Sequence, residues 1–317
     1  MTPGVNQEAV SSAAAVNAPK PRKIGMPARI QTWLRACRVH QWLKNSLVFV
    51  PLVTSHTFHV SGWTAGLLAF LALSFASSAI YLLNDIADQA HDSSHPIKKH
   101  RPIASGELSK IAAIRLAMGC GLIAFLVSIA LPGDFALLLA AYLAVALSYT
   151  HFLKRIWLVD LLVLTGLFQI RVLAGGVATG VELSAWLLTF TIPIFFTLAC
   201  LKRHSEISHT TVASPRHLAG RGYDSDDGFL LAVFGITAAG TSIAALGAYA
   251  IVLPGPVSYS RPAFLFGVAA VLLAFLSHLW RSSLGGRMHF DLIMFVISDR
   301  WSLGLIGVAL AMFWFSL

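Results

Sequence analysis

The chain has 317 residues, of which 56% are hydrophobic and only 12% are charged, and its mean hydropathy is +0.73. A soluble globular protein carries about twice that share of charged residues, so the composition excludes a soluble protein and indicates one that lies in a lipid bilayer. The net charge of +9 is attributed to loops that face anionic lipid, and nothing in the sequence indicates binding to nucleic acid.

Residues 1–30 are rich in Ala, Ser and Pro and contain no apolar run long enough for a signal peptide. We predict a disordered cytoplasmic tail here, followed by a single membrane domain over residues 31–317. The three cysteines are isolated in the sequence and fit no metal-binding spacing. No disulfide is therefore expected.

Runs of apolar residues recur along the rest of the chain, and most are long enough to cross a bilayer. We predict nine transmembrane helices, of which the first is short and interrupted by Pro51. They are expected at 46–60, 63–83, 112–131, 134–150, 157–178, 184–201, 229–252, 262–280 and 302–317. The predicted fold class is an all-α polytopic membrane protein.

The basic residues between the predicted spans indicate the orientation. Of the 23 Lys and Arg residues, all except Arg171 and Arg261 fall on the side of the N-terminus. Because positively charged loops remain in the cytoplasm, we expect an inner (plasma) membrane protein with a cytoplasmic N-terminus. Most polar residues lie on the same side, so the active site is expected on the cytoplasmic face.

The segment after the second predicted span, NDIADQAHD at 84–92, carries three aspartates. On one continuous helix Asp85, Asp88 and Asp92 would project from one side. Such carboxylates repel one another unless a cation neutralises them, and Mg²⁺ binds carboxylates together with phosphate oxygens. The alternative is a solvated helix end with capping acids. Arg101 and other basic residues follow, and the combination favours a site for magnesium diphosphate.

Two further segments are candidates for phosphate binding. In RVHQWLKN, Lys44 lies at the entrance of the first predicted span, where free N–H groups favour an anion. A basic membrane anchor explains Lys44 equally well. In SYTHFLKR, Tyr149 and Lys154 are within reach of the same cavity, although an aromatic belt and the positive-inside rule explain them almost as well.

Charged residues also occur inside the fifth predicted span. The 11 residues from Asp160 to Arg171 correspond to about three helical turns, or roughly 16 Å, so the two side chains cannot pair. A charge at this depth is costly, and each is expected to have its own partner. Before the last predicted span, Asp291 and Asp299 either share a helical face or cap a helix.

After the sixth predicted span, LKRHSEIS contains Lys202, Arg203 and Glu206. Arg203 and Glu206 are three residues apart, so a local salt bridge and a role in the site both remain open. In the loop beyond, Arg221 and Tyr223 are candidates to fold back over the site.

The acidic segment resembles the NDxxDxxxD motif of the UbiA-type polyprenyltransferases, and KKHRPIASGELS resembles the stretch that follows it in that family. The likeness extends from about Arg35 to the C-terminus. It implies nine membrane helices around a polar cavity that opens to the cytoplasm and binds Mg²⁺-diphosphate. It also implies that Asp85, Asp88 and Asp92 hold the metal, while Asn84 orients an aspartate or the ligand.

The chain departs from the aromatic prenyltransferases of that family after the sixth span. Those enzymes carry a second acidic motif, DxxYAxxDxxDD, where this chain reads CLKRHSEISH. The segments HQWLKN, SYTHFLKR, IRVLAGGVA, LKRHSEI and SDR look more like the decaprenyl-phosphate phosphoribosyltransferase branch. That branch transfers ribose 5-phosphate from phosphoribosyl diphosphate to a polyprenyl phosphate and releases diphosphate.

The resemblance therefore implies a Mg²⁺-dependent glycosyl transfer at ribose C1. The expected catalytic residues are Asp85, Asp88, Lys44, Tyr149 and Lys154, and the expected substrate contacts are Asn84, Lys44, Tyr149, Lys154, Arg101, Arg203 and Glu206. Polyprenyl phosphate, phosphoribosyl diphosphate and the bilayer are the expected partners. One alternative is a UbiA-type enzyme that moves a polyprenyl group to an aromatic or other acceptor. A transporter is disfavoured because the opposite face has few polar residues.

Overall fold

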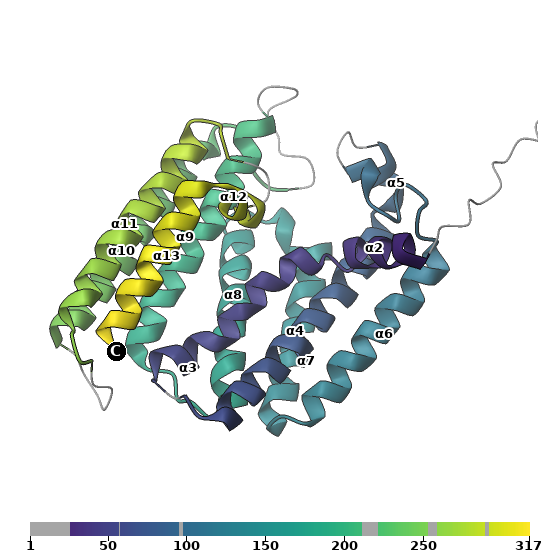
Figure 1. Ribbon diagram of the computed structural model, residues 1–317. Coiled ribbons are helices and arrows are strands. Elements are labelled where there is room, and N and C mark those ends of the chain that lie inside the picture. Colours follow the sequence, from purple (N-terminus) through teal and green to yellow (C-terminus); the bar gives the residue numbers. More distant parts are fainter. Residues whose placement is uncertain (1–25, 57, 95–97, 211–220, 253–258, 289–291) are drawn as a thin grey trace, which may run out of the picture.

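The computed structural model describes residues 26–317 apart from 57, 95–97, 211–220, 253–258 and 289–291, and in this part of the chain the protein contains helices and no strand. The predicted all-α class is confirmed. Seven helices are long and apolar enough to cross a membrane (Figure 1). They are α4 (Val60–Ala87), α6 (Lys110–Ile129), α7 (Gly133–His151), α8 (Val159–Thr179), α9 (Ala185–Thr210), α10 (Asp227–Val252) and α11 (Ala263–Leu284).

The predicted number of nine spans is not confirmed within the described residues. In place of the first, at 46–60, the chain forms a 3-10 helix, η1 (Val39–Phe49), and then the five-residue helix α3 (Val50–Thr54), which has Pro51 in its first turn. Neither is long enough to span a bilayer. The proline stabilises the start of α3 but removes a backbone donor from any continuous helix through this segment.

The last predicted span is part of a bent pair. Helices α12 (Leu292–Ser298) and α13 (Arg300–Ser316) meet at 84° around Asp299, which caps α13 by accepting a hydrogen bond from the amide of Ser302. Counting this pair as one span gives eight in the described chain. Asp291 lies outside the described residues.

The remaining elements are short and lie outside the seven spans. They are α2 (Met26–Ala36), α5 (Gln89–Ser94), η2 (Lys98–His100) and η3 (Leu153–Arg155). Helix α2 begins within the segment 1–30 that was predicted to be a tail, and residues 1–25 are not described.

Helix α8 lies between two groups of helices (Figure 1). It packs against α4, α7, η1 and α3 on one side and against α9 on the other, where α10, α11 and α13 follow. Small side chains permit this close packing. On α4, for example, Ala69, Ala72, Ala76 and Ala79 are all buried.

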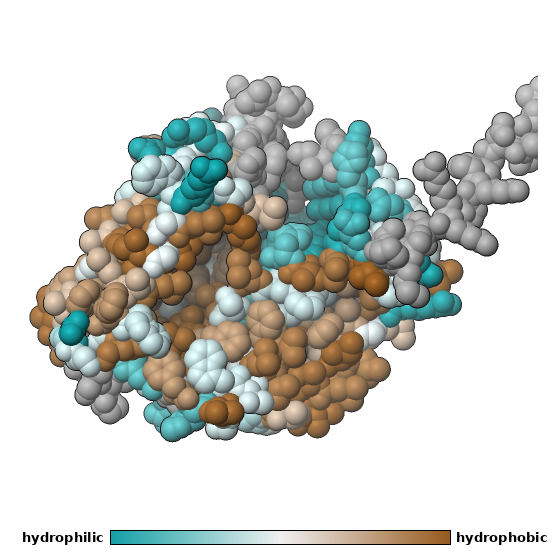
Figure 2. Space-filling model, viewed as in Figure 1, coloured by the Kyte–Doolittle hydropathy of each residue, from teal (hydrophilic) through white to brown (hydrophobic). Residues whose placement is uncertain are grey.

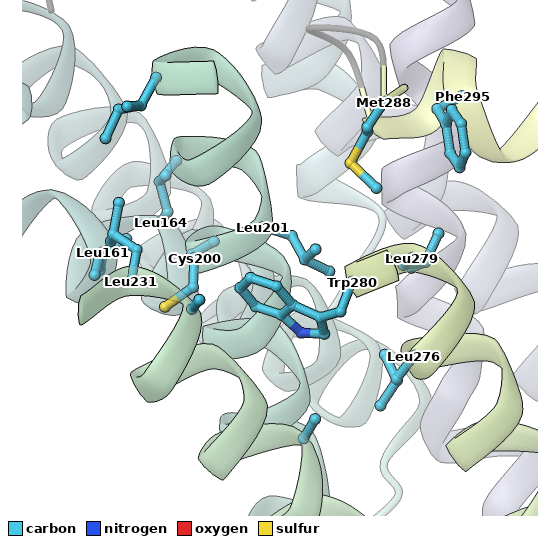
Figure 3. Close-up of a cluster of buried hydrophobic side chains, with 14 of the residues drawn as sticks. Leu161, Leu164, Cys200, Leu201, Leu231, Leu276, Leu279, Trp280, Met288 and Phe295 are labelled. Atoms are coloured by element: carbon cyan, nitrogen blue, oxygen red, sulfur yellow. The ribbon is translucent and has the colours of Figure 1, made fainter. Parts of the chain in front are cut away.

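Large apolar side chains fill the space between α8, α9, α10 and α11 (Figure 3). Trp280 on α11 lies in this cluster beside Cys200 and Leu201 of α9, and its indole nitrogen donates to the hydroxyl of Thr197 at 3.1 Å. A second cluster joins η1, α4, α7 and α8 around Phe135. The two clusters fix α8 between the two groups of helices.

The antiparallel order of the spans brings the polar segments to one end of the molecule. The end of α4, the end of α7, the start of α8 and the end of α9 all lie there. Figure 2 shows hydrophilic side chains concentrated around α5 at this end, above apolar sides.

Candidate functional site

The acidic motif lies on two helices, which corrects the prediction of one continuous helical stripe. Helix α4 ends at Ala87 and α5 begins at Gln89, so the helix is interrupted at Asp88. Asp85 and Asp92 nevertheless lie close together. A single nitrogen of Arg101, Nη1, donates to Asp85 Oδ1 at 3.2 Å and to Asp92 Oδ2 at 2.5 Å.

A second arginine, Arg38, contacts the same motif. Its Nη2 donates to Asp85 Oδ1 at 2.5 Å, and its guanidinium lies 4.8 Å from the centre of the Tyr81 ring. Asp85 is only 4% exposed and Asp92 only 1%, so these cations neutralise carboxylates that would be costly to bury alone. Our sequence reasoning did not single out Arg38, although it precedes η1 at the same end of the molecule.

The motif offers oxygen atoms that suit Mg²⁺. Asn84 Oδ1 and Asp92 Oδ1 are buried and have no hydrogen-bond partner in the described structure. Carboxylate and amide oxygens are hard ligands of the kind that Mg²⁺ binds. Among the described residues no three His, Cys, Asp or Glu side chains are placed together as a metal site. These oxygen atoms are suitable ligands for Mg²⁺. In this structure Arg101 bridges two of the candidate ligands, Asp85 and Asp92.

Lys154 on η3 faces the acidic motif from the other side. Its ammonium is half-buried, and burial lowers its pKa while the charge of Asp88 opposes that shift. Arg221, Arg155 and Lys98 are also close enough to lower the pKa of Lys154. Asp88 and Lys154 are thus near enough to each other for their charges to interact.

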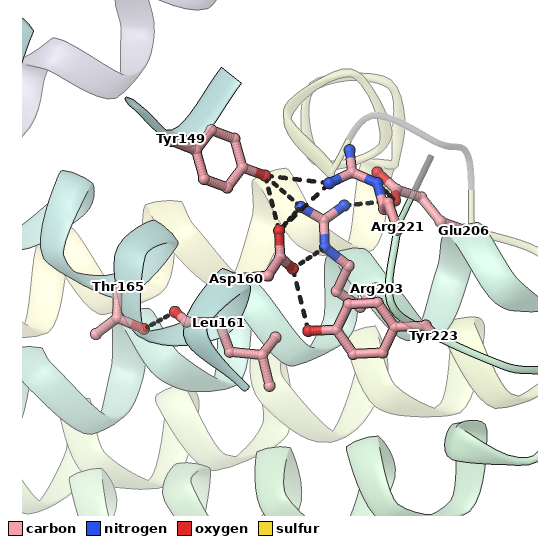
Figure 4. A network of polar contacts seen from close by, with 8 residues as sticks. All are labelled: Tyr149, Asp160, Leu161, Thr165, Arg203, Glu206, Arg221 and Tyr223. Atoms are coloured by element: carbon pink, nitrogen blue, oxygen red, sulfur yellow. Dashed lines mark hydrogen bonds and ion pairs between the residues drawn. The ribbon is translucent and has the colours of Figure 1, made fainter. Parts of the chain in front are cut away.

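A second polar cluster is built around Asp160 (Figure 4). Asp160 is fully buried in the first turn of α8, where the helix dipole favours a carboxylate. It accepts hydrogen bonds from the hydroxyls of Tyr149 at 3.0 Å and Tyr223 at 3.1 Å. Arg203 donates to both of its oxygens, and Arg221 Nη1 lies 3.3 Å from Oδ1.

Arg203 connects this cluster to the end of α9. It is 0% exposed, and it donates to Glu206 as well as to Asp160 and, at 2.6 Å, to the hydroxyl of Tyr149. Arg221 closes the cluster by placing its Nε 3.2 Å from Glu206 Oε2. Every polar atom of the Arg203 guanidinium therefore has a partner inside the protein.

The loop residues fold back onto this cluster, as the sequence suggested for Arg221 and Tyr223. Gly222 between them packs directly on η3, because a Cβ atom there would lie 2.4 Å from the carbonyl oxygen of Arg155. A larger residue would lift the loop off η3 and draw Arg221 away from Asp160.

Lys202 differs from its neighbour Arg203. It is half-buried, and within the described residues it makes no hydrogen bond or ion pair. Its ammonium lies close enough to Lys44 of η1 for the two charges to repel one another. Two cations, Lys202 of α9 and Lys44 of η1, thus approach each other here.

The prediction that Asp160 and Arg171 have separate partners is confirmed. Asp160 pairs with Arg203, whereas Arg171 donates from Nε to Asn45 Oδ1 at 2.8 Å and from Nη2 to the hydroxyl of Tyr142 at 3.2 Å. Asn45 was not predicted to have a role.

The model of the UbiA prenyltransferase family matches residues 47–288. Protein y4nM of Sinorhizobium fredii is 34% identical over 87% of this chain, which spans 54% of the length of that relative. The nodulation protein NoeC of Azorhizobium caulinodans is 31% identical, and the match covers 89% of this chain and 92% of NoeC. Decaprenyl-phosphate phosphoribosyltransferase of Mycobacterium tuberculosis is 34% identical over 55% of this chain and 59% of the enzyme.

The fold also matches solved structures. A UbiA homologue from Archaeoglobus fulgidus, bound to GPP and Mg²⁺, superposes with a TM-score of 0.65 over 89% of this chain and 99% of the homologue, at 15% identity. At that identity the likeness concerns the arrangement of the helices.

Proposed function

The chain belongs to the UbiA prenyltransferase family and is a multi-pass membrane transferase, and within that family we propose a phosphoribosyltransferase. The proposed reaction moves the 5-phosphoribosyl group from phosphoribosyl diphosphate to a polyprenyl phosphate such as decaprenyl phosphate, with Mg²⁺ as cofactor. The proposed location is the inner (plasma) membrane, with the N-terminus and the active site on the cytoplasmic side.

The observation that carries this proposal is the charge at the end of α9. Where the aromatic prenyltransferases have a second acidic motif, this chain has Lys202, Arg203 and Glu206. Glu206 is held by Arg203 and Arg221, so it is not available to bind a second metal ion. Lys202 instead offers its ammonium to a second phosphate group, in a region whose positive charge Lys44 increases.

Such a charge pattern suits a ligand with phosphate at both ends. Phosphoribosyl diphosphate carries a diphosphate on C1 and a phosphate on C5 of the ribose. We place the diphosphate beside Asp85, Asp88, Asp92 and Lys154, and the 5-phosphate beside Lys44 and Lys202. The relatives named decaprenyl-phosphate phosphoribosyltransferase support this choice of donor.

The proposed step is a displacement at ribose C1. The bond from C1 to the diphosphate oxygen breaks, the diphosphate leaves with the electron pair, and an oxygen of the lipid phosphate forms the new bond. That phosphate is ionised at neutral pH, so no strong general base is required. Lys154 and Arg101 would hold the leaving group by charge. Bound Mg²⁺, held by Asn84 and the three aspartates, would stabilise the charge on the diphosphate.

Tyr149, Arg203 and Glu206 take a supporting part in this proposal. Arg203 bonds to Tyr149 and Glu206, Tyr149 and Arg203 bond to Asp160, and Arg221 contacts Tyr149 and Glu206. We propose that they position the ends of α7, α8 and α9, and so orient Lys202 and Lys154 towards the ligand.

Purified protein in lipid, supplied with Mg²⁺ and decaprenyl phosphate, tests the proposal with two labelled donors. Transfer of label from phosphoribosyl diphosphate to the lipid, absent in an Asp88→Asn variant, is the expected result. Transfer from a labelled prenyl diphosphate to an aromatic acid would favour the second candidate, a prenyltransferase. The likeness to a homologue bound to GPP and Mg²⁺ supports that candidate.

A further inference from the structure

The segment Val39–Phe49 is wound as a 3-10 helix over 11 residues, although such helices rarely exceed three or four residues. Its exposed positions recur every third residue, as three residues per turn require. His40, Leu43 and Ser46 are exposed, whereas Gln41, Asn45 and Val48 are buried. The winding therefore divides the segment into three faces, each with a different environment.

One face is fastened to α4 and α8. The indole nitrogen of Trp42 donates to Ser78 at 2.9 Å, and Asn45 Nδ2 lies 3.0 Å from the hydroxyl of Ser74. Val48 packs so closely on α8 that a Cβ atom at Gly175 would lie 2.1 Å from the Val48 carbonyl oxygen. Only glycine permits this approach of one backbone to the other.

Two cations flank the fastened face. Arg38 precedes the segment as its N-cap, in a left-handed backbone conformation with φ 50°, and Lys44 lies in the middle of the winding. Arg38 donates to Asp85, and Lys44 approaches Lys202 of α9. An α-helix over the five residue steps from Val39 to Lys44 would turn about 100° less and rise about 2.5 Å less. Lys44 would then turn away from Lys202.

Arg171 holds the fastened face from inside the membrane. It is 5% exposed, and the described residues give it no carboxylate partner. Its guanidinium donates to Asn45 Oδ1, to the hydroxyl of Tyr142 and to the Leu167 carbonyl, and it lies 5.1 Å from the centre of the Tyr142 ring. A cation buried in this way is costly, and its contact with Asn45 joins α8 to the middle of the 3-10 segment.

We propose that Arg171 and Asn45 keep residues 39–49 in the 3-10 winding, so that Arg38 and Lys44 face one phosphate site together. Arg171 is then a positioning residue for anion binding. This role rests on one part of the proposed function, namely that the ligand contains phosphate. It requires neither a particular transferred group nor a particular acceptor.

Spin labels on cysteines placed at Ile30 and Val60, both exposed, measure the length of the segment by electron paramagnetic resonance. Rewinding 11 residues from 3-10 to α shortens the segment by about 5–6 Å. Arg171→Met should shorten or broaden the measured distance and weaken binding of inorganic diphosphate with Mg²⁺ by about 10- to 100-fold. Asn45→Leu should act in the same way, and Arg171→Lys should restore part of both effects.

Thr191→Val is the matched control, since Thr191 is buried and bonded to Gln169, away from the segment. It should leave the distance and the affinity unchanged. An unchanged distance in both Arg171→Met and Asn45→Leu, or an equal change in the control, would overturn the proposal. The distance readout needs no ligand and the binding readout uses inorganic diphosphate, so a different transferred group would defeat the proposed function without affecting this result.

Discussion

Arg203 on α9 and Asp160 on α8 form an ion pair in which neither side chain is exposed. Two guanidinium nitrogens, Nε and Nη2, donate to the two carboxylate oxygens, and this planar pairing is the arrangement that arginine forms best. The pair joins the start of one span to the end of the next. It makes Arg203 a structural cation although it lies beside a candidate ligand cation, Lys202.

Arg203→Met should therefore destabilise the protein. Removing one partner leaves the carboxylate of Asp160 buried without its main counter-charge, which costs about 3–5 kcal/mol. The midpoint of thermal unfolding in detergent measures the effect, with the exposed Arg281 changed to Met as the control. The double variant Arg203→Met, Asp160→Leu should recover part of the loss, because an apolar pair removes the unpaired charge. Equal midpoints for Arg203→Met and the control would contradict this account.

Lys202→Ala should have the opposite profile. Lys202 makes no hydrogen bond or ion pair within the described residues, so its removal should leave the unfolding midpoint unchanged. Binding of phosphoribosyl diphosphate should weaken by about 10- to 150-fold, the loss expected for one charge-assisted contact, while inorganic diphosphate binds nearly as before. Calorimetry with both ligands measures this difference, with Lys110→Ala as the control. Equal weakening of both ligands would place Lys202 at the diphosphate end.

The sequence was sufficient to predict the helical membrane fold and the location of the acidic motif. Apolar runs identify spans by length alone. The aspartates of the segment from Asn84 to Asp92 indicate a site for a metal ion and a diphosphate. The break at Asp88 was not predicted, and neither was the bridge that Arg101 forms between Asp85 and Asp92 on either side of it. Arg101 lies outside the helices that carry the two aspartates, so no helical spacing in the sequence indicates that it contacts them.

The partners of buried charges could be expected but not identified. The cost of burying Asp160 and Arg171 indicates that each has a partner, whereas the identity of that partner depends on how the spans pack. Asn45 lies 126 residues from Arg171 in the chain, and it looks like an ordinary polar residue near a membrane boundary. The 3-10 winding of its segment was likewise not predicted, and the contacts that we propose to hold it come from the distant helices α4 and α8.

Asp88→Asn should abolish most activity without loss of fold. Asp88 is half-buried at the break between α4 and α5, and no ion pair in the described structure includes it. If it helps to hold Mg²⁺, the variant should lower turnover by about 100- to 1,000-fold and raise the Mg²⁺ concentration needed for half-maximal rate. Glu107→Gln, which loses only the exposed pair with Arg35, is the control. Near-normal turnover and an unchanged Mg²⁺ requirement would remove Asp88 from the metal site.

The proposed orientation can be tested with single cysteines at the two ends of the bundle. The native cysteines are buried, so a membrane-impermeant thiol reagent should react only with introduced ones. Ser94→Cys on α5 should be labelled from the cytoplasmic side, and Glu182→Cys, between α8 and α9, from the opposite side. Both positions are exposed. Labelling of both from one side would refute the antiparallel order of the spans.

Binding of diphosphate should depend on pH through Lys154. Burial lowers the pKa of its ammonium below the usual value of about 10.4, so the charge that holds a phosphate is lost as pH rises through that lowered value. Affinity for magnesium diphosphate should therefore fall as the pH rises, with a midpoint below about 10.4. The free energy of unfolding should rise with pH over the same range, because between the two pKa values the unfolded chain binds more protons than the folded one.

Two variants isolate the contribution of this group. Lys154→Arg keeps a cation that does not titrate in the accessible range, so its affinity should persist to higher pH than that of the wild type. Lys154→Met should bind weakly at every pH and lack the corresponding step, while the exposed Lys110→Met should behave as the wild type. Diphosphate titrations across the alkaline range measure all four proteins. If the step survives unchanged in Lys154→Met, the titrating group is another ammonium and Lys154 does not contact the ligand.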